Sequence, residues 1–341
     1  MRLTVSQEQI IKESNGGTWI TYESKSETTV TRYISESGWT PSVTRDPKPE
    51  PLCKSFIHNS VSSWEKARKV LERINEGNRI EIRKVTRKVQ WEDYECVEEK
   101  VVNFISFKGR KFAYTGDPND IPSVLEFLRE EKDFRPSPVF VEKATVILDP
   151  DAVSNLLVGL VSMLRGDSPQ ISSDERGLPD ITLYDEPTIP YSHAFAYFDD
   201  EGVATNRKEL IGNGQVINYL GTRTTKVGSP GNARGFVPKP DFFNMVLKPG
   251  DWKLNELIQE SKNAFLVMGS HGSELVKKSL RIRPRRVIQL GGGEISLREL
   301  AVPLAELSTL DAVTADSRFV YLDDDHGALA PFVRLRARFL Y

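Results

Sequence analysis

The chain has four histidines, the side chains best suited to metal binding or acid–base chemistry near neutral pH. A catalytic metal needs several imidazole, thiolate or carboxylate ligands at fixed spacing, such as two histidines on one face of a helix. No histidine here has another histidine or a cysteine at such a spacing; the four are His58, His193, His271 and His326. The sequence therefore shows no recognisable zinc motif.

Two of these histidines lie beside other reactive groups. His326 follows Asp323, Asp324 and Asp325, whose carboxylates could hold a hard cation. A solvated acidic hairpin turn explains the same residues, and we prefer that interpretation. His271 lies between Ser270 and a glycine, but serine catalysis also needs a base and an orienting acid in contact, which a sequence cannot show.

Two charged clusters also have a chemical and a structural interpretation. Asp199, Asp200 and Glu201 could act as general acids or bases, but acids at a strand end before a glycine more often form a turn, which we expect here. Four arginines along one expected strand could bind phosphate or an acidic peptide. Because the formal net charge is −2, we favour instead a solvated strand that faces a partner subunit; these residues are Arg281, Arg283, Arg285 and Arg286.

Composition narrows the class of protein. The 341 residues include 46 basic and 48 acidic side chains, so nothing attracts the whole chain to nucleic acid or to an anionic membrane. The only cysteines, Cys53 and Cys96, provide neither a disulfide framework nor a four-ligand zinc ribbon. Residues 1–14 are polar, and no later run is long and apolar enough to span a membrane. We expect a cytoplasmic globular protein.

The elements that would position these residues fall into two domains, since a single core rarely serves more than about 300 residues. We place the boundary in a proline-containing run, which gives an N-terminal α/β domain of residues 1–138 and a β-rich domain of residues 139–341. The first should hold a helix at 6–14, strands at 18–24, 28–35, 79–89 and 96–115, an exposed Pro-rich loop at 38–51, and helices from Ser62 and from Asp120.

The second domain should begin with a strand at 141–148 that turns into a helix. Asp149 can cap the first helical amides, and Pro150 has the φ angle of a first turn. Apolar residues cover most of this helix, so we expect it to be buried; they are Val153, Leu156, Leu157, Leu160, Val161 and Leu164. The predicted fold class is α+β: helices on a mixed sheet, then a larger β-rich domain around a buried helix.

An ordered series of segments in the second half resembles the TldD/TldE (PmbA) family of zinc metalloproteases, once called modulators of DNA gyrase. The series comprises the strand, Asp-Pro turn and helix of 141–167, the runs Asp185–Pro190 and Phe198–Thr205, Asn213-Gly214, Tyr219-Leu220, Gly231–Arg234 and Leu247–Gly250. The resemblance extends over about 141–319, and the first domain looks shorter than is usual in the family.

The resemblance implies where a zinc site would lie. In the TldD branch, His-Glu-x-x-x-His follows the Asp-Pro turn and a cysteine near the C-terminus completes the site. Here no histidine, glutamate or cysteine occurs between Asp149 and Asp167, and no cysteine follows Cys96. The helix is more similar to the TldE branch, which lacks the metal motif. We therefore expect no catalytic residue and no metal in this chain, and zinc in a TldD-like partner.

The predicted function is that of a TldE-like, non-catalytic subunit in a TldD/TldE-type metalloprotease that processes unfolded peptides. Gly231, Asn232 and Arg234 match a segment that borders the family's peptide channel, although a turn needing Gly and Asn explains them equally well. Two alternatives stay open: a peptidase with its own non-standard metal site, and a homodimer that binds peptides without cleaving them. Partners would be the TldD-like subunit or a second copy, not nucleic acid or a membrane.

Overall fold

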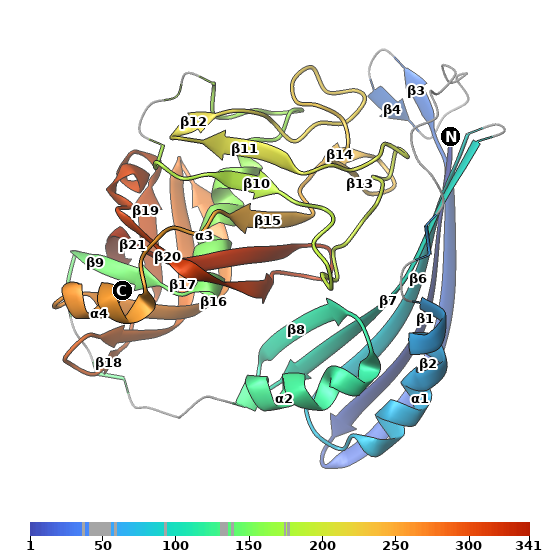
Figure 1. The fold of residues 1–341 in the computed structure, drawn as a ribbon, viewed down its shortest axis with the longest axis horizontal. Coiled ribbons are helices and arrows are strands. Elements are labelled where there is room, and N and C mark those ends of the chain that lie inside the picture. The colour runs from blue at the N-terminus through green and yellow to red at the C-terminus, as the bar shows by residue number, and fades with distance from the viewer. Residues whose placement is uncertain are drawn as a thin grey trace. The chain divides into compact units, whose positions relative to one another are not determined.

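The computed structural model describes residues 1–35, 38–40, 56–57, 60–91, 94–129, 136–137, 140–173, 175 and 178–341 (Figure 1). Cys53, His58 and residues 41–51 of the predicted Pro-rich loop lie outside the described residues. Among those described, no helix has the length and apolar character needed to cross a bilayer.

The chain folds into two compact units. Unit 1 comprises residues 1–132, 187–206 and 221–243, and unit 2 comprises residues 133–186, 207–220 and 244–341. Two segments from the second half of the chain therefore complete the first unit, and no sequence pattern signals this exchange. The domain boundary that the sequence suggests, between residues 138 and 139, stays a prediction.

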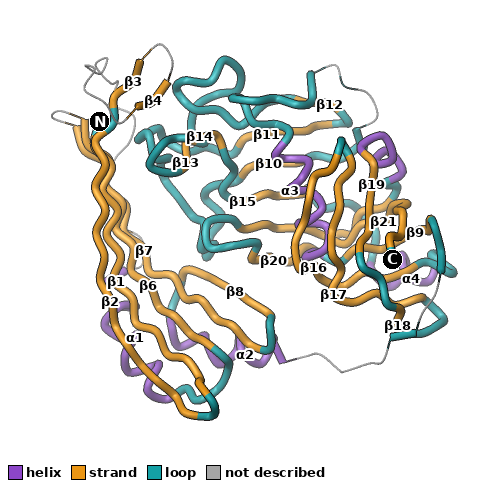
Figure 2. The backbone as a smooth tube through the Cα atoms, turned by 180° about the vertical axis from the view of Figure 1, so that it is seen from behind, coloured by secondary structure: helices purple, strands orange, loops and turns teal. Residues whose placement is uncertain are grey.

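Unit 1 is built on a six-stranded sheet with the order β2-β1-β6-β7-β5, and β8 also pairs with β7 (Figures 1 and 2). All neighbours are antiparallel except β5, which runs parallel to β7, so the sheet is mixed as predicted. The strands are β1 Arg2–Asn15, β2 Thr18–Thr31, β5 Phe56–Ile57, β6 Arg79–Trp91, β7 Tyr94–Phe107 and β8 Arg110–Thr115; a separate hairpin joins β3 Tyr33–Ser35 and β4 Gly38–Thr40.

The helix predicted at residues 6–14 is wrong, because this segment is strand β1. Ser6 and Gln9, which suggested a helix cap, donate instead to side chains across the strand pair, Glu27 and Ser24 respectively, at 2.7 Å each. The glycines that suggested a helix end form the tight turn to β2, with positive φ at Gly16 and Gly17. The two strands predicted at 18–24 and 28–35 are mainly the single strand β2.

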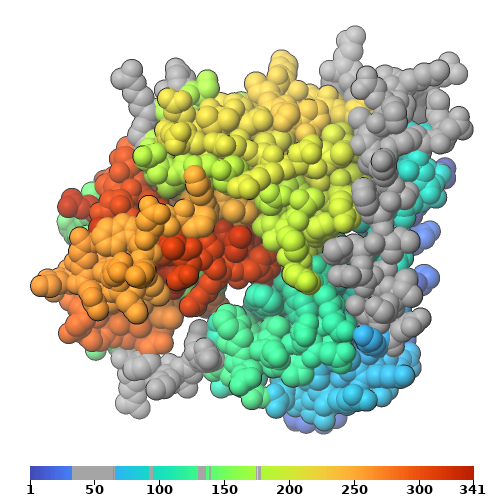
Figure 3. Space-filling view, in the orientation of Figure 1, coloured from blue at the N-terminus to red at the C-terminus, as the bar shows by residue number. Residues whose placement is uncertain are grey.

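Helices α1 Ser60–Arg73 and α2 Ile121–Arg129, with the 3₁₀ turn η1 Pro118–Asp120, confirm the other predicted helices of the first half. Their apolar faces join the inner residues of β6 and β7 in one core that includes Leu71, Ile82, Ile105 and Leu125. Their outer faces form part of the surface of unit 1 (Figure 3). Within unit 1, β13 Ala233–Arg234 and β14 Lys239–Pro240 form a further short hairpin.

Unit 2 holds an eleven-stranded sheet that curls until β21 pairs with both β19 and β9, so that β9, β16, β17, β19 and β21 close a ring (Figure 2). Helix α3 Pro150–Ser162 packs on β16, β17, β20 and β21. The α+β class with a buried helix is confirmed. The strands are β9 Lys143–Leu148, β10 Leu183–Asp185, β11 Lys208–Gly212, β12 Gln215–Val216, β15 Asn244–Leu247, β16 Phe265–Val276, β17 Ser279–Gln289, β18 Glu294–Ile295, β19 Glu299–Pro303, β20 Ala312–Tyr321 and β21 Gly327–Leu340, with α4 Leu254–Glu260 and η2 Leu304–Thr309.

Candidate functional site

Helix α3 begins as the sequence predicts. The Asp149 carboxylate accepts a hydrogen bond from the Ala152 amide at 2.8 Å, and Pro150 occupies the first turn. Asp149 also accepts from the amide of Gly269 on β16, at 2.9 Å. Burial raises the pKa of Asp149, although these two hydrogen bonds and the charge of Arg285 oppose the rise. The cap therefore fixes the helix to the neighbouring strand as well as starting it.

Most of α3 is buried. The burial extends to Gly159, where a β-carbon would lie 2.8 Å from Leu280 on β17, so the helix backbone approaches the sheet closely. Along this face, aliphatic side chains fill the space between the helix and the strands that surround it: Val153, Leu156, Leu157, Leu160 and Val161. An imidazole or a carboxylate that pointed toward the strands here would leave an unpaired polar or charged group in an apolar core.

One stripe of α3 is only partly buried, formed by Asp151, Asn155, Val158 and Ser162 at helical spacing. Each polar member already has a partner inside the chain. Asp151 accepts from Asn155 at 2.8 Å and pairs with Arg285 of β17, and the Ser162 hydroxyl donates to the carbonyl of Gly159 at 2.7 Å. The side chains of this stripe offer neither an imidazole nor a thiolate to a metal.

Metal ligands do not gather elsewhere in the part of the chain that the structure describes: no three His, Cys, Asp or Glu side chains stand close enough to share an ion. His193 is buried edge-on against Phe104, with the ring centroids 6.3 Å apart. His271 is exposed on β16. His326 caps the β20–β21 turn with its Nδ1 2.8 Å from the Asp323 carboxylate, so the acidic run forms the expected hairpin turn.

The predicted channel residues lie in unit 1, at the start of the β13–β14 hairpin. Gly231 has φ +113°, a conformation that favours glycine. The buried Asn232 side chain donates to the carbonyl of Asp241 at 3.3 Å, and the Arg234 guanidinium stacks on Phe243 at 4.4 Å. Two of the three residues therefore have structural contacts, and their substrate-facing role stays a prediction.

The acidic run before Gly202 is the turn that the sequence predicts, but it is buried. Asp199 accepts from the amides of Glu201 at 2.9 Å, Val203 at 3.0 Å and Ala233 at 3.0 Å. Asp200 accepts from the amide of Gly235 at 2.6 Å. These two carboxylates therefore attach the predicted channel segment to the turn.

Two arginines, one on strand β6 and one just after β2, complete this network. Arg87 of β6 contacts Asp200 at 2.9 Å and Glu98 of β7 at 3.3 Å, and its guanidinium stacks on Phe198. Burial alone would lower the pKa of Arg87, but the charges of Glu98 and Asp200 outweigh burial and raise it. Arg32 donates to the carbonyls of Gly235 and Phe236, at 3.1 Å each. No sequence motif indicates either arginine, because Asp200 lies 113 residues from Arg87, and Gly235 lies 203 residues from Arg32.

A carboxyl group with an altered pKa lies at the centre of this network. Burial and the neighbouring charge of Glu201 raise the pKa of Asp199 to about 7, against three amide hydrogen bonds that lower it. Such a group could transfer protons near neutral pH. It is enclosed, however, and its oxygens are occupied by main-chain amides, so its geometry is that of a structural clamp.

A family model, described as the PmbA/TldA metallopeptidase C-terminal domain, matches residues 141–301, which include α3 and the acidic turn. Residues 141–301 therefore form a domain of the TldD/PmbA family. The Methanocaldococcus jannaschii protein named metalloprotease MJ0996 is 27% identical over 223 residues, 59% of this chain and 49% of that protein. This chain thus spans about half the length of this curated relative.

Solved TldD/PmbA structures have the same fold over nearly the whole chain. TldE from Thermococcus kodakarensis superposes with a TM-score of 0.70 at 15% identity, covering 99% of this chain and 96% of that one. A Thermotoga maritima protein assigned as a modulator of a DNA gyrase gives 0.67 at 15% identity, covering 99% and 95%. At this identity the likeness concerns fold alone.

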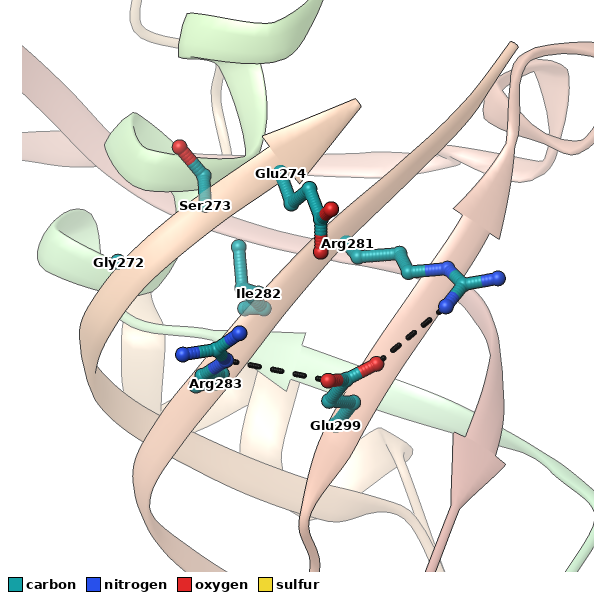
Figure 4. A pocket seen from close by; sticks show the side chains of 7 residues that line it. All are labelled: Gly272, Ser273, Glu274, Arg281, Ile282, Arg283 and Glu299. Carbon is teal, nitrogen blue, oxygen red and sulfur yellow. Dashed lines mark hydrogen bonds and ion pairs between the residues drawn. The ribbon is translucent and has the colours of Figure 1, made fainter. Parts of the chain in front are cut away.

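The arginine row on β17 is the remaining chemical feature of the TldD/PmbA domain. Arg281 and Arg283 both point toward Glu299 of β19, at 3.5 and 3.8 Å, across an open pocket that Gly272 and Ser273 also line (Figure 4). The next two arginines pair with Asp151 and Glu294. Since all four guanidinium groups have carboxylate neighbours within the chain, the row has little spare charge for phosphate or an acidic peptide.

Proposed function

We propose that this chain is a TldE-like, non-catalytic subunit of a TldD/TldE-type metalloprotease that acts on unfolded peptides in the cytoplasm. The observation that carries the proposal is that helix α3 contains no histidine, glutamate or cysteine. This helix follows the Asp-Pro turn after which a TldD-type chain would carry its histidines. Here Asp151 is neutralised by Arg285, and no residues of α3 at the five-residue spacing of His-Glu-x-x-x-His are histidines.

In this proposal the chain forms part of the wall that guides the peptide and supplies no catalytic group. The segment that contains Asn232 and Arg234 is held by Asp199, Asp200 and Arg32, so its backbone is fixed before any peptide arrives. A fixed wall can guide an extended peptide without losing conformational entropy at each binding event. The zinc, the water it activates and the general base would all belong to the TldD-like partner.

The test is reconstitution from the organism's own cells. We expect the tagged chain to co-purify with a homologue that carries His-Glu-x-x-x-His, and an unfolded peptide to be cleaved only when both chains are present. Zinc should be stoichiometric with the homologue and absent from this chain alone. Cleavage at the same rate by the homologue alone would contradict a role for this subunit.

The same metal measurement separates the proposal from a self-sufficient peptidase. Stoichiometric zinc in the chain alone, lost in His193→Ala, His271→Ala or His326→Ala, would establish a non-standard site and overturn the non-catalytic role. Peptide binding without cleavage, in a chain that never brings down a His-Glu-x-x-x-His homologue, would favour the homodimeric peptide-binding protein.

A further inference from the structure

Three consecutive acidic residues attach one segment of unit 1 to another. Their side chains are buried, and each accepts a hydrogen bond from a main-chain amide of residues 221–243. The three bonds run from Ala233 to Asp199 at 3.0 Å, from Gly235 to Asp200 at 2.6 Å and from Arg223 to Glu201 at 2.7 Å. The attached segment contains the predicted channel residues, so its position depends on carboxyl groups that are closed off from solvent.

Asp199 differs from Asp200 in having no counterion in contact. Its oxygens accept hydrogen bonds from three main-chain amides, and among the described residues no arginine or lysine pairs with it. Asp200, by contrast, pairs with Arg87 at 2.9 Å. Because a fully buried carboxylate without a counterion is unfavourable, such a group takes up a proton instead. The pKa of Asp199, which burial and the charge of Glu201 raise to about 7, agrees with this geometry.

Opening of the turn would remove the preference for a proton. Once residues 221–243 separate from the turn, water reaches Asp199 and its pKa returns toward the ordinary value of 3.8. We propose that Asp199 acts as a proton-dependent latch: while it holds a proton the turn keeps residues 221–243 attached, and loss of the proton favours their release. Only the description of this segment as part of a peptide wall rests on the proposed function.

Other charged groups pack around the turn and set the balance. They are Asp200 and Glu201 of the turn itself, Arg87 of β6, Glu98 of β7, Arg32 after β2, and Arg223 and Arg234 of the attached segment. Arginine keeps its charge at any pH used here, so the arginines contribute a constant field. Asp200 has its own arginine, which leaves the charge of Glu201 as the main electrostatic opponent of ionised Asp199.

The direction of the pH dependence follows from these two states. Between about pH 4 and pH 7 only the closed turn holds the proton on Asp199, so opening releases a proton and becomes more favourable as pH rises. Outside this window both states carry the same charge, and the ratio of open to closed turns is constant. The latch is therefore tightest in acid, and the ratio should rise about 50-fold between pH 5 and pH 7.

The test is amide hydrogen exchange in the chain alone, without peptide or partner, corrected for the pH dependence of the chemical exchange step. The opening constants of the Ala233 and Gly235 amides should rise about 50-fold from pH 5 to pH 7. The matched control is the amide of Asn78, which donates to the carbonyl of Ser106 at 2.8 Å elsewhere in unit 1. Its opening constant should change by less than about twofold.

Substitutions in the turn identify the group that holds the proton. Asp199→Asn keeps an oxygen acceptor but cannot ionise, so the opening constant of Gly235 should be the same at pH 5 and pH 7. Glu201→Gln removes the neighbouring charge and should reduce the rise, because Asp199 then ionises at lower pH in the closed turn. Asp200→Asn is the matched control: it should raise opening at every pH and keep the rise, since Asp200 already has Arg87.

Three results would overturn the latch. One is an opening constant at Ala233 and Gly235 that does not change with pH in the wild type. Another is an equal rise at Asn78, which would mean that the whole unit opens. The third is an undiminished rise in both Asp199→Asn and Glu201→Gln. None of these results bears on co-purification with a zinc-bearing homologue, so the latch and the proposed function can fail separately.

Discussion

The two units bury different chemistry. Around α3, unit 2 buries aliphatic side chains against the surrounding strands. Beside β6 and β7, unit 1 buries Arg87 between Glu98 and Asp200, with Asp199 close by. Truncation of a side chain in an apolar core lowers the free energy of unfolding roughly in proportion to the volume of the cavity that it leaves. Loss of one member of a buried ionic network instead leaves another member with an uncompensated charge. The comparison predicts where single substitutions should be most severe.

The largest effect is expected from Arg87→Met. It preserves an apolar stem but leaves Glu98 and Asp200 buried without a cation, which should lower the free energy of unfolding by about 3–5 kcal/mol. The matched control is Arg68→Met, since the Arg68 side chain is 63% exposed and its pairing with Glu23 should be worth less than about 1 kcal/mol. Urea denaturation measures both, and equal losses would contradict the distinction.

A smaller loss should follow truncation in the other core. Leu160→Ala removes a fully buried side chain from α3 and should cost about 3 kcal/mol, because the surrounding strands can only partly fill the cavity. Val158→Ala, on the partly buried stripe of the same helix, should cost clearly less. If the two variants unfold at the same urea concentration, α3 is not packed as described.

Removing the cap of α3 should cost less again. Asp149→Ala leaves the amides of Ala152 and Gly269 without their acceptor, and the expected loss is about 1–2 kcal/mol. Asp167→Ala, an exposed residue after the same helix, provides the comparison and should be nearly neutral. If Asp149→Ala leaves the free energy of unfolding unchanged, water replaces the carboxylate as the acceptor for these amides.

The subtlest expectation concerns pH. With the pKa of Asp199 near 7 in the folded chain and near its ordinary value of 3.8 when unfolded, only the folded state holds this proton between those values. Stability contributed by the group is therefore fully present below about pH 4 and falls as pH rises toward about 7. Asp199→Asn should remove this component, so its urea midpoint should decline less than the wild-type midpoint over that range. If the urea midpoints of the variant and the wild type decline in parallel, the pKa of Asp199 in the folded chain is not raised into this range.

Local chemistry in the sequence predicted much of the fold correctly. Asp149-Pro150 marked the start of α3, and its apolar pattern marked a buried helix. The failure at β1 has a physical reason: Ser6 and Gln9 suit a helix cap as well as a strand pair, and only the partner strand decides between them.

The candidate site was harder to predict because its contacts are remote in sequence. Arg87 and Asp200 are separated by 113 residues, and Arg32 and Gly235 by 203. Neither arginine lies in a motif, so only the folded chain identifies them. By contrast, the missing metal ligands could be inferred directly, since a zinc helix requires particular residue types at one local spacing.

The discontinuity of unit 1 also has a consequence for the order of synthesis. Residues 1–132 leave the ribosome first, yet residues 187–206 and 221–243 are needed to complete that unit. Until the chain has grown past Asp200, Arg87 and Glu98 of the nascent sheet lack a main neighbour and must be hydrated. At the usual ~5–20 residues per second, this interval lasts several seconds. The emerging N-terminal sheet thus lacks part of its packing partners. Premature termination of synthesis between these segments would release a fragment in which Arg87 has lost its contact with Asp200.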